Sequence, residues 1–290
     1  MQAGQTGLII YFKDKEDMIV KVDLKYFSGT GNSYKVLDTC RDVFIQNGCR
    51  TTLSSVTKQS ETGKSDIDKS ADLIGFCFPV YAFDIPRICK TYLSNLPGFE
   101  RKIRAFVLIT AGDSKEAGFS VRESARILTR KGLDVTYTKV IQMPANWTVL
   151  MNPPSQKEAL SIIKTGIISA KQAARDILNG VVHHHRFNYP PTYSKAGFYK
   201  DYYLFKWLGL SNYWREFRTD ETCDSCGLCE KLCPTDSIRM VSGKPNWSKT
   251  CEQCMRCVNY CPNQAIFLKS GGSIKGKNTY HEPTFRPNTS

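Results

Sequence analysis

The 290-residue sequence lacks any apolar run that approaches the roughly 18 consecutive residues of a membrane helix. The apolar stretch at 7–12 is too short for a signal-peptide core and is followed at once by charged residues. The chain has only four histidines, three of them adjacent at 183–185, and no zinc-finger spacing. No nucleophile and base pair calls for hydrolysis, so no catalytic residue is assigned. These absences predict a cytoplasmic location, no membrane insertion and no nucleic-acid partner.

Acidic residues are also scarce, because 27 Asp and Glu stand against 40 Lys and Arg, a formal net charge of +13. The basic residues are spread along the chain, which is typical of a solvated basic surface. The alternative is a docking face for an acidic protein, since complementary fields speed encounter. The run of three histidines is likewise interpreted as solvated.

Strand and helix patterns alternate through the first 180 residues. Strands are expected at 20–27, 50–56, 71–80, 103–112 and 134–143, and helices at 31–48, 85–96, 119–132 and 155–180. The run at 71–80 suits a strand that is buried on both faces. The alternation predicts an α/β fold with a doubly wound, five-stranded parallel sheet.

Cysteine is abundant and unevenly placed, with eight of the twelve between 223 and 261. They form two C-x2-C-x2-C-x3-C-P runs, and each cysteine of the first run has a counterpart 28 residues later in the second. This is the bacterial ferredoxin run, in which the fourth cysteine ligates the other 4Fe-4S cluster. Two zinc sites fit the spacing poorly. The expected ligands are Cys223, Cys226, Cys229 and Cys261 for cluster one, and Cys251, Cys254, Cys257 and Cys233 for cluster two.

The other cysteines, Cys40, Cys49, Cys77 and Cys89, are interpreted as structural. The two runs differ at one charged position, because Arg256 stands where the first run has Leu228. A positive charge near the sulfurs favours the reduced cluster, so we expect cluster two to have the higher potential. The alternative is that Arg256 points to solvent.

The segment SGTGNS (28–33) lies between the first expected strand and helix. It lacks the Lys-Ser/Thr pair of a Walker loop and the third glycine of a dinucleotide loop. Backbone N–H groups at a helix start, with the hydroxyls of Ser28, Thr30 and Ser33, predict a site that holds a cofactor phosphate. A generic Gly-Ser turn is the alternative.

Two later loops leave the ends of the third and fourth strands. The first offers Pro79, Val80, Tyr81, Ala82 and Phe83, and the second Thr110, Ala111, Gly112 and Asp113. With the strand order 2-1-3-4-5, these loops converge on the first at one crevice. Their aromatic and main-chain lining suits a flat ring, although Tyr81 and Phe83 could be ordinary core aromatics.

The motifs S-G-T-G-N-S, P-V-Y-x-F and T-A-G-D resemble the flavodoxin family. With the cysteine runs, and with MPANW (143–147), the chain resembles fused proteins that join a flavodoxin to a bacterial-type α+β double-cluster ferredoxin. The resemblance implies FMN and two 4Fe-4S clusters as cofactors. The FMN phosphate would lie on Ser28, Gly29, Thr30, Gly31, Asn32 and Ser33, and the two later loops would frame the ring. Simple flavodoxins are usually acidic and this chain is basic, so the resemblance does not identify the partner of this chain.

The resulting division is an N-terminal arm (1–17), an FMN-binding domain (18–180), an aromatic-rich connecting segment (181–218), a ferredoxin domain (219–270) and a tail (271–290). The expected function is electron transfer between the clusters and FMN for a redox partner, for which the basic surface suggests an acidic protein. The alternative is an FMN-dependent reductase that acts directly on a small substrate, and a third possibility is that the flavin has been lost. Partner, direction of electron flow and oligomeric state stay open.

Overall fold

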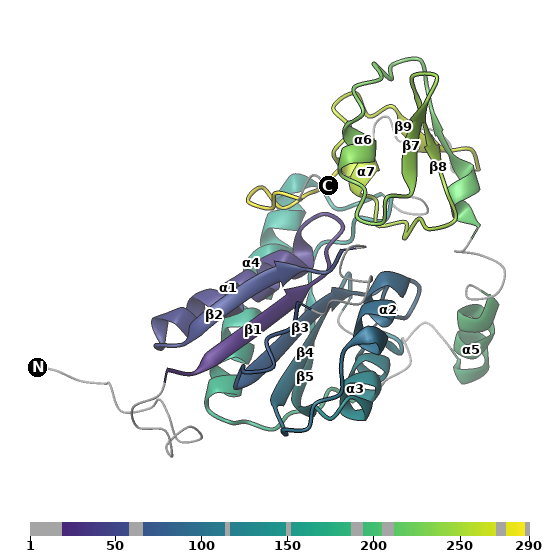
Figure 1. Cartoon of the computed structure of the whole chain (residues 1–290). Coiled ribbons are helices and arrows are strands. Elements are labelled where there is room, and N and C mark those ends of the chain that lie inside the picture. The colour runs from purple at the N-terminus through teal and green to yellow at the C-terminus, as the bar shows by residue number, and fades with distance from the viewer. Residues whose placement is uncertain are drawn as a thin grey trace, which may run out of the picture.

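The computed structural model describes residues 19–57, 66–113, 117–148, 152–186, 194–204, 212–270 and 277–287. The expected N-terminal arm at 1–17 lies outside the described residues. Figure 1 shows an α/β layer structure, with a smaller cysteine-rich part over one end of its sheet. We refer to 19–180 as the flavodoxin-like part and to 212–270 as the ferredoxin-like part.

The central sheet is parallel and has the expected order β2-β1-β3-β4-β5. Its strands are β1 (Lys21–Tyr26), β2 (Arg50–Ser55), β3 (Leu73–Pro79), β4 (Arg104–Ala111) and β5 (Asp134–Gln142). The helices are α1 (Asn32–Gln46), α2 (Arg87–Asn95), α3 (Ser120–Arg130) and α4 (Gln156–Leu178). The doubly wound α/β prediction is therefore confirmed.

Two apolar cores flank the sheet. Helices α1 and α4 cover one face, and α2 and α3 cover the other (Figure 1). Strand β3 is buried from Leu73 to Phe78, as its uninterrupted apolar run predicts. The four cysteines outside the runs are buried in these cores, and none of the twelve cysteines, all of which are described, forms a disulfide.

Helix α4 begins with a capping box. The Ser155 hydroxyl accepts from the Glu158 N–H at 3.4 Å, and the Glu158 carboxylate accepts from the Ser155 N–H at 2.8 Å. Each satisfies a donor that a helix start leaves without an intrahelical partner. Ser155 is therefore the N-cap of this helix.

Gly75 lies at the centre of β3, opposite Leu24 on β1 and Phe106 on β4. A Cβ built on Gly75 would stand 2.1 Å from Cζ of Phe106. Gly75→Ala is expected to lower the free energy of unfolding by about 2 kcal/mol, because the buried ring has to move. Chemical denaturation measures the change. Gly98→Ala is the control, since nothing lies within 4 Å of its Cβ position; equal losses in both variants would contradict the packing argument.

The ferredoxin-like part repeats itself in structure as it does in sequence. Its elements are β6 (Phe217–Thr219), α6 (Leu228–Lys231), β7 (Ile238–Val241), β8 (Lys244–Trp247), α7 (Arg256–Asn259) and β9 (Ile266–Leu268). Positive φ angles recur 28 residues apart, at the pairs Ser225 and Gln253, Gly227 and Met255, Asp236 and Gln264. The same backbone turn is therefore built twice, once around each cysteine run.

The connecting segment packs against the flavodoxin-like part where it is described. On α5 (Lys195–Leu204), the buried Phe198 contacts Phe83 and Phe119, and the Tyr202 hydroxyl donates to Asp84 at 3.0 Å. Residues 183–185 were expected to be solvated, yet they also pair with β5, where the Thr138 N–H donates to the His183 carbonyl at 2.7 Å. The remainder at 187–193 and 205–211 lies outside the described residues.

Candidate functional site

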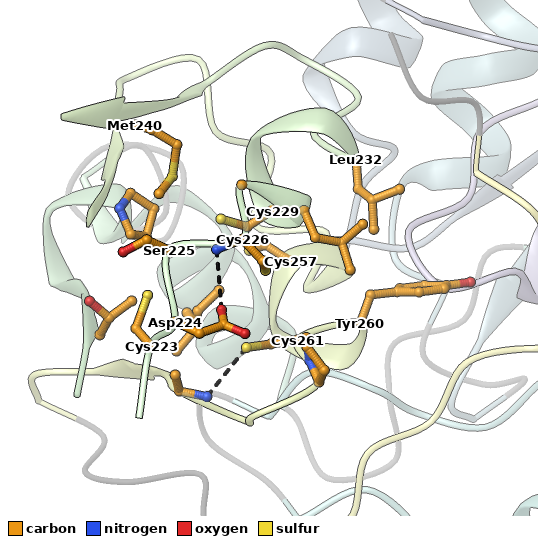
Figure 2. A pocket seen from close by; sticks show the side chains of 17 residues that line it. Cys223, Asp224, Ser225, Cys226, Cys229, Leu232, Met240, Cys257, Tyr260 and Cys261 are labelled. Carbon is orange, nitrogen blue, oxygen red and sulfur yellow. Dashed lines mark hydrogen bonds between the residues drawn. The ribbon is translucent and has the colours of Figure 1, made fainter. Parts of the chain in front are cut away.

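The first cysteine cavity lies inside the ferredoxin-like part (Figure 2). It brings together the cysteines expected for cluster one: Cys223, Cys226, Cys229 and Cys261. Cys223 and Cys226 come from the loop before α6, Cys229 lies in α6 itself, and Cys261 follows α7 at the end of the second run. Leu232, Met240 and Ile266 supply an apolar wall.

The second cavity has the mirrored arrangement. Its cysteines are Cys251, Cys254 and Cys257 of the second run, joined by Cys233 from the end of the first. Each cavity thus contains three cysteines of one run and the fourth cysteine of the other, although Cys257 also borders the first cavity. This is the crossed grouping that a two-cluster ferredoxin requires.

In both cavities, N–H groups donate hydrogen bonds to cysteine sulfurs, as is typical of iron–sulfur sites. The Ser237 N–H donates to Cys233 Sγ at 3.2 Å, and its repeat equivalent Ala265 donates to Cys261 Sγ at 3.4 Å. Trp247 borders the second cavity, and its buried indole N–H is directed at the Cys257 sulfur. An indole N–H is a donor only, so a sulfur acceptor in this cavity would satisfy it.

Burial makes bare thiolates unfavourable in the second cavity. It raises the pKa of Cys251 to about 12 and that of Cys254 to about 11. Thiolate ligands at these positions therefore need a compensating positive charge, which iron supplies. Among the described residues, no three His, Cys, Asp or Glu side chains form a group that could hold a single metal ion.

The phosphate-loop candidate, residues 28–33, joins β1 to α1 and is almost entirely buried. Gly31, at the N-cap of α1, has φ 105°, no side chain caps the helix, and its first turn has no acidic residue. The N–H groups of Asn32 and Ser33 find no acceptor among the described residues. The helix start therefore presents open donors and a positive dipole end, which fits a phosphate.

Hydroxyls and amides around this loop are fixed by neighbouring strands. The Ser28 hydroxyl accepts from the Gly31 N–H at 2.9 Å, and Ser33 shares a 2.8 Å hydrogen bond with Thr110 at the end of β4. Asn146, in the loop after β5, donates to the Thr30 hydroxyl. The ends of β1, β4 and β5 thus meet here.

The loop after β3 makes a tight turn at the same edge. Ala82 and Phe83 both have positive φ, at 49° and 65°, and Tyr81 and Asp84 exchange backbone hydrogen bonds across them. Such strained residues persist only where the surroundings fix them, and they occur often at ligand sites. Pro79 and Val80 precede the turn, where the Val80 N–H donates to the Thr110 carbonyl at 3.0 Å.

The two aromatics of this turn point to different places. A Cβ on Gly29 would lie 2.9 Å from the Tyr81 hydroxyl, and the Tyr81 ring contacts Phe27, so Tyr81 borders the phosphate loop. The Phe83 ring packs instead on Phe198 of α5. Of the pair expected to frame a flat ring, Tyr81 is beside the phosphate loop, while Phe83 fixes the turn to the connecting segment.

The loop after β4 completes this edge only in part. Ala111 is buried, Gly112 and Asp113 are exposed, and 114–116 lie outside the described residues. The Gly112 carbonyl accepts from Gln142 at 3.0 Å, and a Cβ on Gly112 would stand 3.1 Å from Ala145. Gly112 and Asp113 therefore remain exposed at the end of β4, although the Gly112 carbonyl is already bound by Gln142.

Arg256 joins the second cysteine run to the phosphate loop. It is 5% exposed, and its guanidinium donates to the carbonyls of Gly29 at 3.0 Å, Ser28 at 2.6 Å and Leu232 at 2.9 Å. The alternative that Arg256 points to solvent is therefore wrong. Next to it, a Cβ on Gly29 would lie 2.2 Å from the Cys254 carbonyl, so this glycine is required for the close approach of the two parts.

Two further contacts hold the parts together, and that of Arg87 was not indicated by the sequence. Arg87, at the start of α2, donates to the Cys251 carbonyl at 2.6 Å and pairs with Glu252 at 3.3 Å. Trp147, after β5, packs on the ferredoxin-like core. The second cavity is consequently the one that faces the crevice.

The tail also closes over the phosphate loop, which no sequence pattern predicted. The Glu282 N–H donates to the Thr30 carbonyl at 2.8 Å, and the buried Phe285 contacts Tyr34 of α1. A Cβ on Gly31 would lie 2.5 Å from that of Glu282. The tail at 277–287 therefore covers the outer side of the loop and packs into the α1 and α4 core.

Comparisons with known proteins found similarities to separate parts of the chain. Residues 215–273 match the family model described as a 4Fe-4S dicluster domain. No curated protein matches the chain. Among the described residues, no helix is long and apolar enough to cross a membrane.

Several solved structures resemble the flavodoxin-like part. A Streptococcus pneumoniae TIGR4 flavodoxin is 15% identical, covering 55% of this chain and 97% of its own, with a TM-score of 0.37. An NADH:FMN oxidoreductase (EMOB) in its apo form is 13% identical, covering 60% and 97%, with a TM-score of 0.41. General stress protein 14 of Treponema denticola, solved in complex with FMN, is 16% identical, covering 53% and 99%, with a TM-score of 0.34. The strand order itself, rather than these distant likenesses, establishes the flavodoxin-like fold.

Proposed function

We propose that this chain is an iron–sulfur flavoprotein that relays electrons between two 4Fe-4S clusters and FMN for a redox partner. The observation that carries the proposal is the contact between the second cysteine cavity and the phosphate loop. The Cys254 carbonyl abuts Gly29, and Arg256 bridges the second run to Ser28 and Gly29. The residues that would hold the two kinds of cofactor therefore share one interface.

The residues of the chain would bind and orient the cofactors and set the electrostatic environment around them. When bound, the clusters transfer single electrons and FMN accepts one or two, which allows conversion between one- and two-electron steps. The start of α1 would hold the phosphate through the N–H groups of Asn32 and Ser33. Tyr81 would border the isoalloxazine ring, and the exposed main chain after β4 would lie beside it.

The burial of this interface favours direct transfer within the chain. Tyr81 lies between the end of β1 and Cys254. Arg256, Arg87 and the tail each fix the ferredoxin-like part against the carboxyl ends of the strands. We further propose a cytoplasmic location, since the four buried cysteines outside the runs are free thiols, which suits a reducing compartment.

Cofactor content tests the proposal. Anaerobic purification, followed by quantification of flavin and iron in one sample, is expected to give close to one FMN per eight irons. Titration of the flavin-free protein should favour FMN over riboflavin by about a hundredfold or more, because charge-assisted hydrogen bonds to a phosphate stabilise by about 1.5–3 kcal/mol each. Iron without any flavin, or equal affinity for the two flavins, would contradict the proposal.

A further inference from the structure

An open groove of about 480 Å³ lies on the ferredoxin-like part, outside both cysteine cavities. Strands β6 and β8 form it together with the turn that precedes β6. Neither the sequence motifs nor the proposed cofactor sites account for this groove. Its walls are aromatic and its rim is cationic.

All charged residues that line the groove are basic. Arg215, Arg218 and Lys244 are exposed along it, and none of its lining residues is acidic. The Arg215 guanidinium lies 5.1 Å from the centre of the Trp214 ring, and Arg218 donates to the Arg215 carbonyl at 2.7 Å. Within the described part of the chain, these three cations form no ion pair with a carboxylate. Their charge is therefore available to an acidic surface.

The groove shares walls with both cysteine cavities. Thr219 and Pro245 border the groove and the first cavity, whereas Phe217 and Trp247 border the groove and the second. The rings of Phe217 and Trp247 stack with their centres 5.3 Å apart. A partner bound in this groove would be separated from each cysteine cavity by these shared wall residues.

We propose that this groove docks an acidic electron-transfer protein, and that electrons enter or leave the clusters here. The inference rests on the proposed function and adds to it the place and the chemistry of the partner. In each encounter, the donor centre is oxidised by one electron and the acceptor centre is reduced by one, with no bond or proton transferred. Cationic rims steer acidic partners and raise association rates by about 10- to 1,000-fold at low ionic strength.

The double variant Arg215→Glu/Arg218→Glu tests the docking site in the cluster-loaded protein. The probe is a purified acidic flavodoxin, and stopped-flow absorbance follows electron transfer between it and the dithionite-reduced protein. At low ionic strength, the second-order rate constant should fall about 10- to 100-fold, and its dependence on salt should largely disappear. The milder Arg215→Gln/Arg218→Gln pair should show an intermediate loss.

The control is Lys157→Glu/Lys164→Glu on the exposed side of α4, which changes the net charge equally but lies on the other part of the chain. It should lose less than about threefold. An unchanged rate in the arginine pair, or an equal loss in the control, would overturn the docking site. So would reduction of the loaded protein by NADH that depends on the two arginines, because the groove would then take a dinucleotide.

Failure of the docking site and failure of the proposed function are distinguishable. Iron, sulfide and flavin content and reduction by dithionite are measured for every variant before the kinetic test. A protein that contains cofactors and accepts electrons from dithionite, but transfers them at a rate independent of the arginines, contradicts the docking site alone. A wild-type protein without iron or flavin contradicts the proposed function itself.

Discussion

Replacing Cys233 with serine is expected to remove or degrade the cluster of the second cavity, although Cys233 belongs to the first run. In the structure, Cys233 borders the cavity of Cys251, Cys254 and Cys257, and the other three cysteines of its run surround the first cavity. A serine hydroxyl is a poor replacement for a thiolate iron ligand. We expect the anaerobically purified variant to lose about half of its iron, from eight toward four per chain.

Matched variants identify which cluster is lost. Electron paramagnetic resonance of the reduced Cys233→Ser protein should resemble that of Cys251→Ser, because both remove a ligand of the second cavity. Cys261→Ser should resemble Cys223→Ser instead, because both border the first cavity. The crossed assignment fails if Cys233→Ser gives the spectrum of Cys223→Ser, since each run would then hold its own cluster.

The elements and the cysteine grouping could be predicted because their signals are local. Alternating apolar segments define β1 to β5, and the 28-residue offset defines the two runs. The recurring positive φ angles show that the offset is a repeat of conformation as well as of sequence. The parallel, doubly wound sheet followed from the same alternation, whereas the order 2-1-3-4-5 is what the resemblance to flavodoxins implied.

The interface between the two parts could not be predicted from such signals. Arg256 reaches Ser28 and Gly29 across more than two hundred residues, and no spacing in the chain encodes that contact. The sequence could show only that a charge replaced Leu228 in the repeat. Likewise, Gly29 and Gly31 were interpreted as phosphate-loop glycines, whereas the structure adds a second reason, the close approach of Cys254 and Glu282.

The direction of the Phe83 side chain could not be predicted from the sequence for a different reason. An aromatic residue after a strand end indicates the crevice, but its direction depends on the turn that carries it. With positive φ at Ala82 and Phe83, the turn directs the Phe83 ring toward α5, where Phe198 receives it. Tyr81, before the turn, remains beside the phosphate loop. Backbone strain of this kind is not visible in a propensity pattern, because two consecutive non-glycine residues rarely adopt it.

Replacing Arg256 with leucine is expected to lower the free energy of unfolding and the potential of the second cluster together. Three carbonyls would lose a charged donor in a buried setting, which costs about 3 kcal/mol or more. Burial raises the pKa of the neighbouring Cys254, and the guanidinium partly offsets this rise, because its positive charge favours electron density on that sulfur. Its loss should shift the midpoint potential of the second cluster down by on the order of 50 to 100 mV.

Arg256→Lys separates the charge from the hydrogen-bonding geometry. An ammonium keeps the positive charge but cannot reach three carbonyls with the planar fork of a guanidinium. We therefore expect Arg256→Lys to keep most of the potential and to lose much of the stability, as measured by spectroscopic redox titration and by chemical denaturation. If the leucine variant leaves both potentials unchanged, Arg256 acts only as a link between the two parts. If stability is also unchanged, the buried guanidinium does not hold the second run against the phosphate loop.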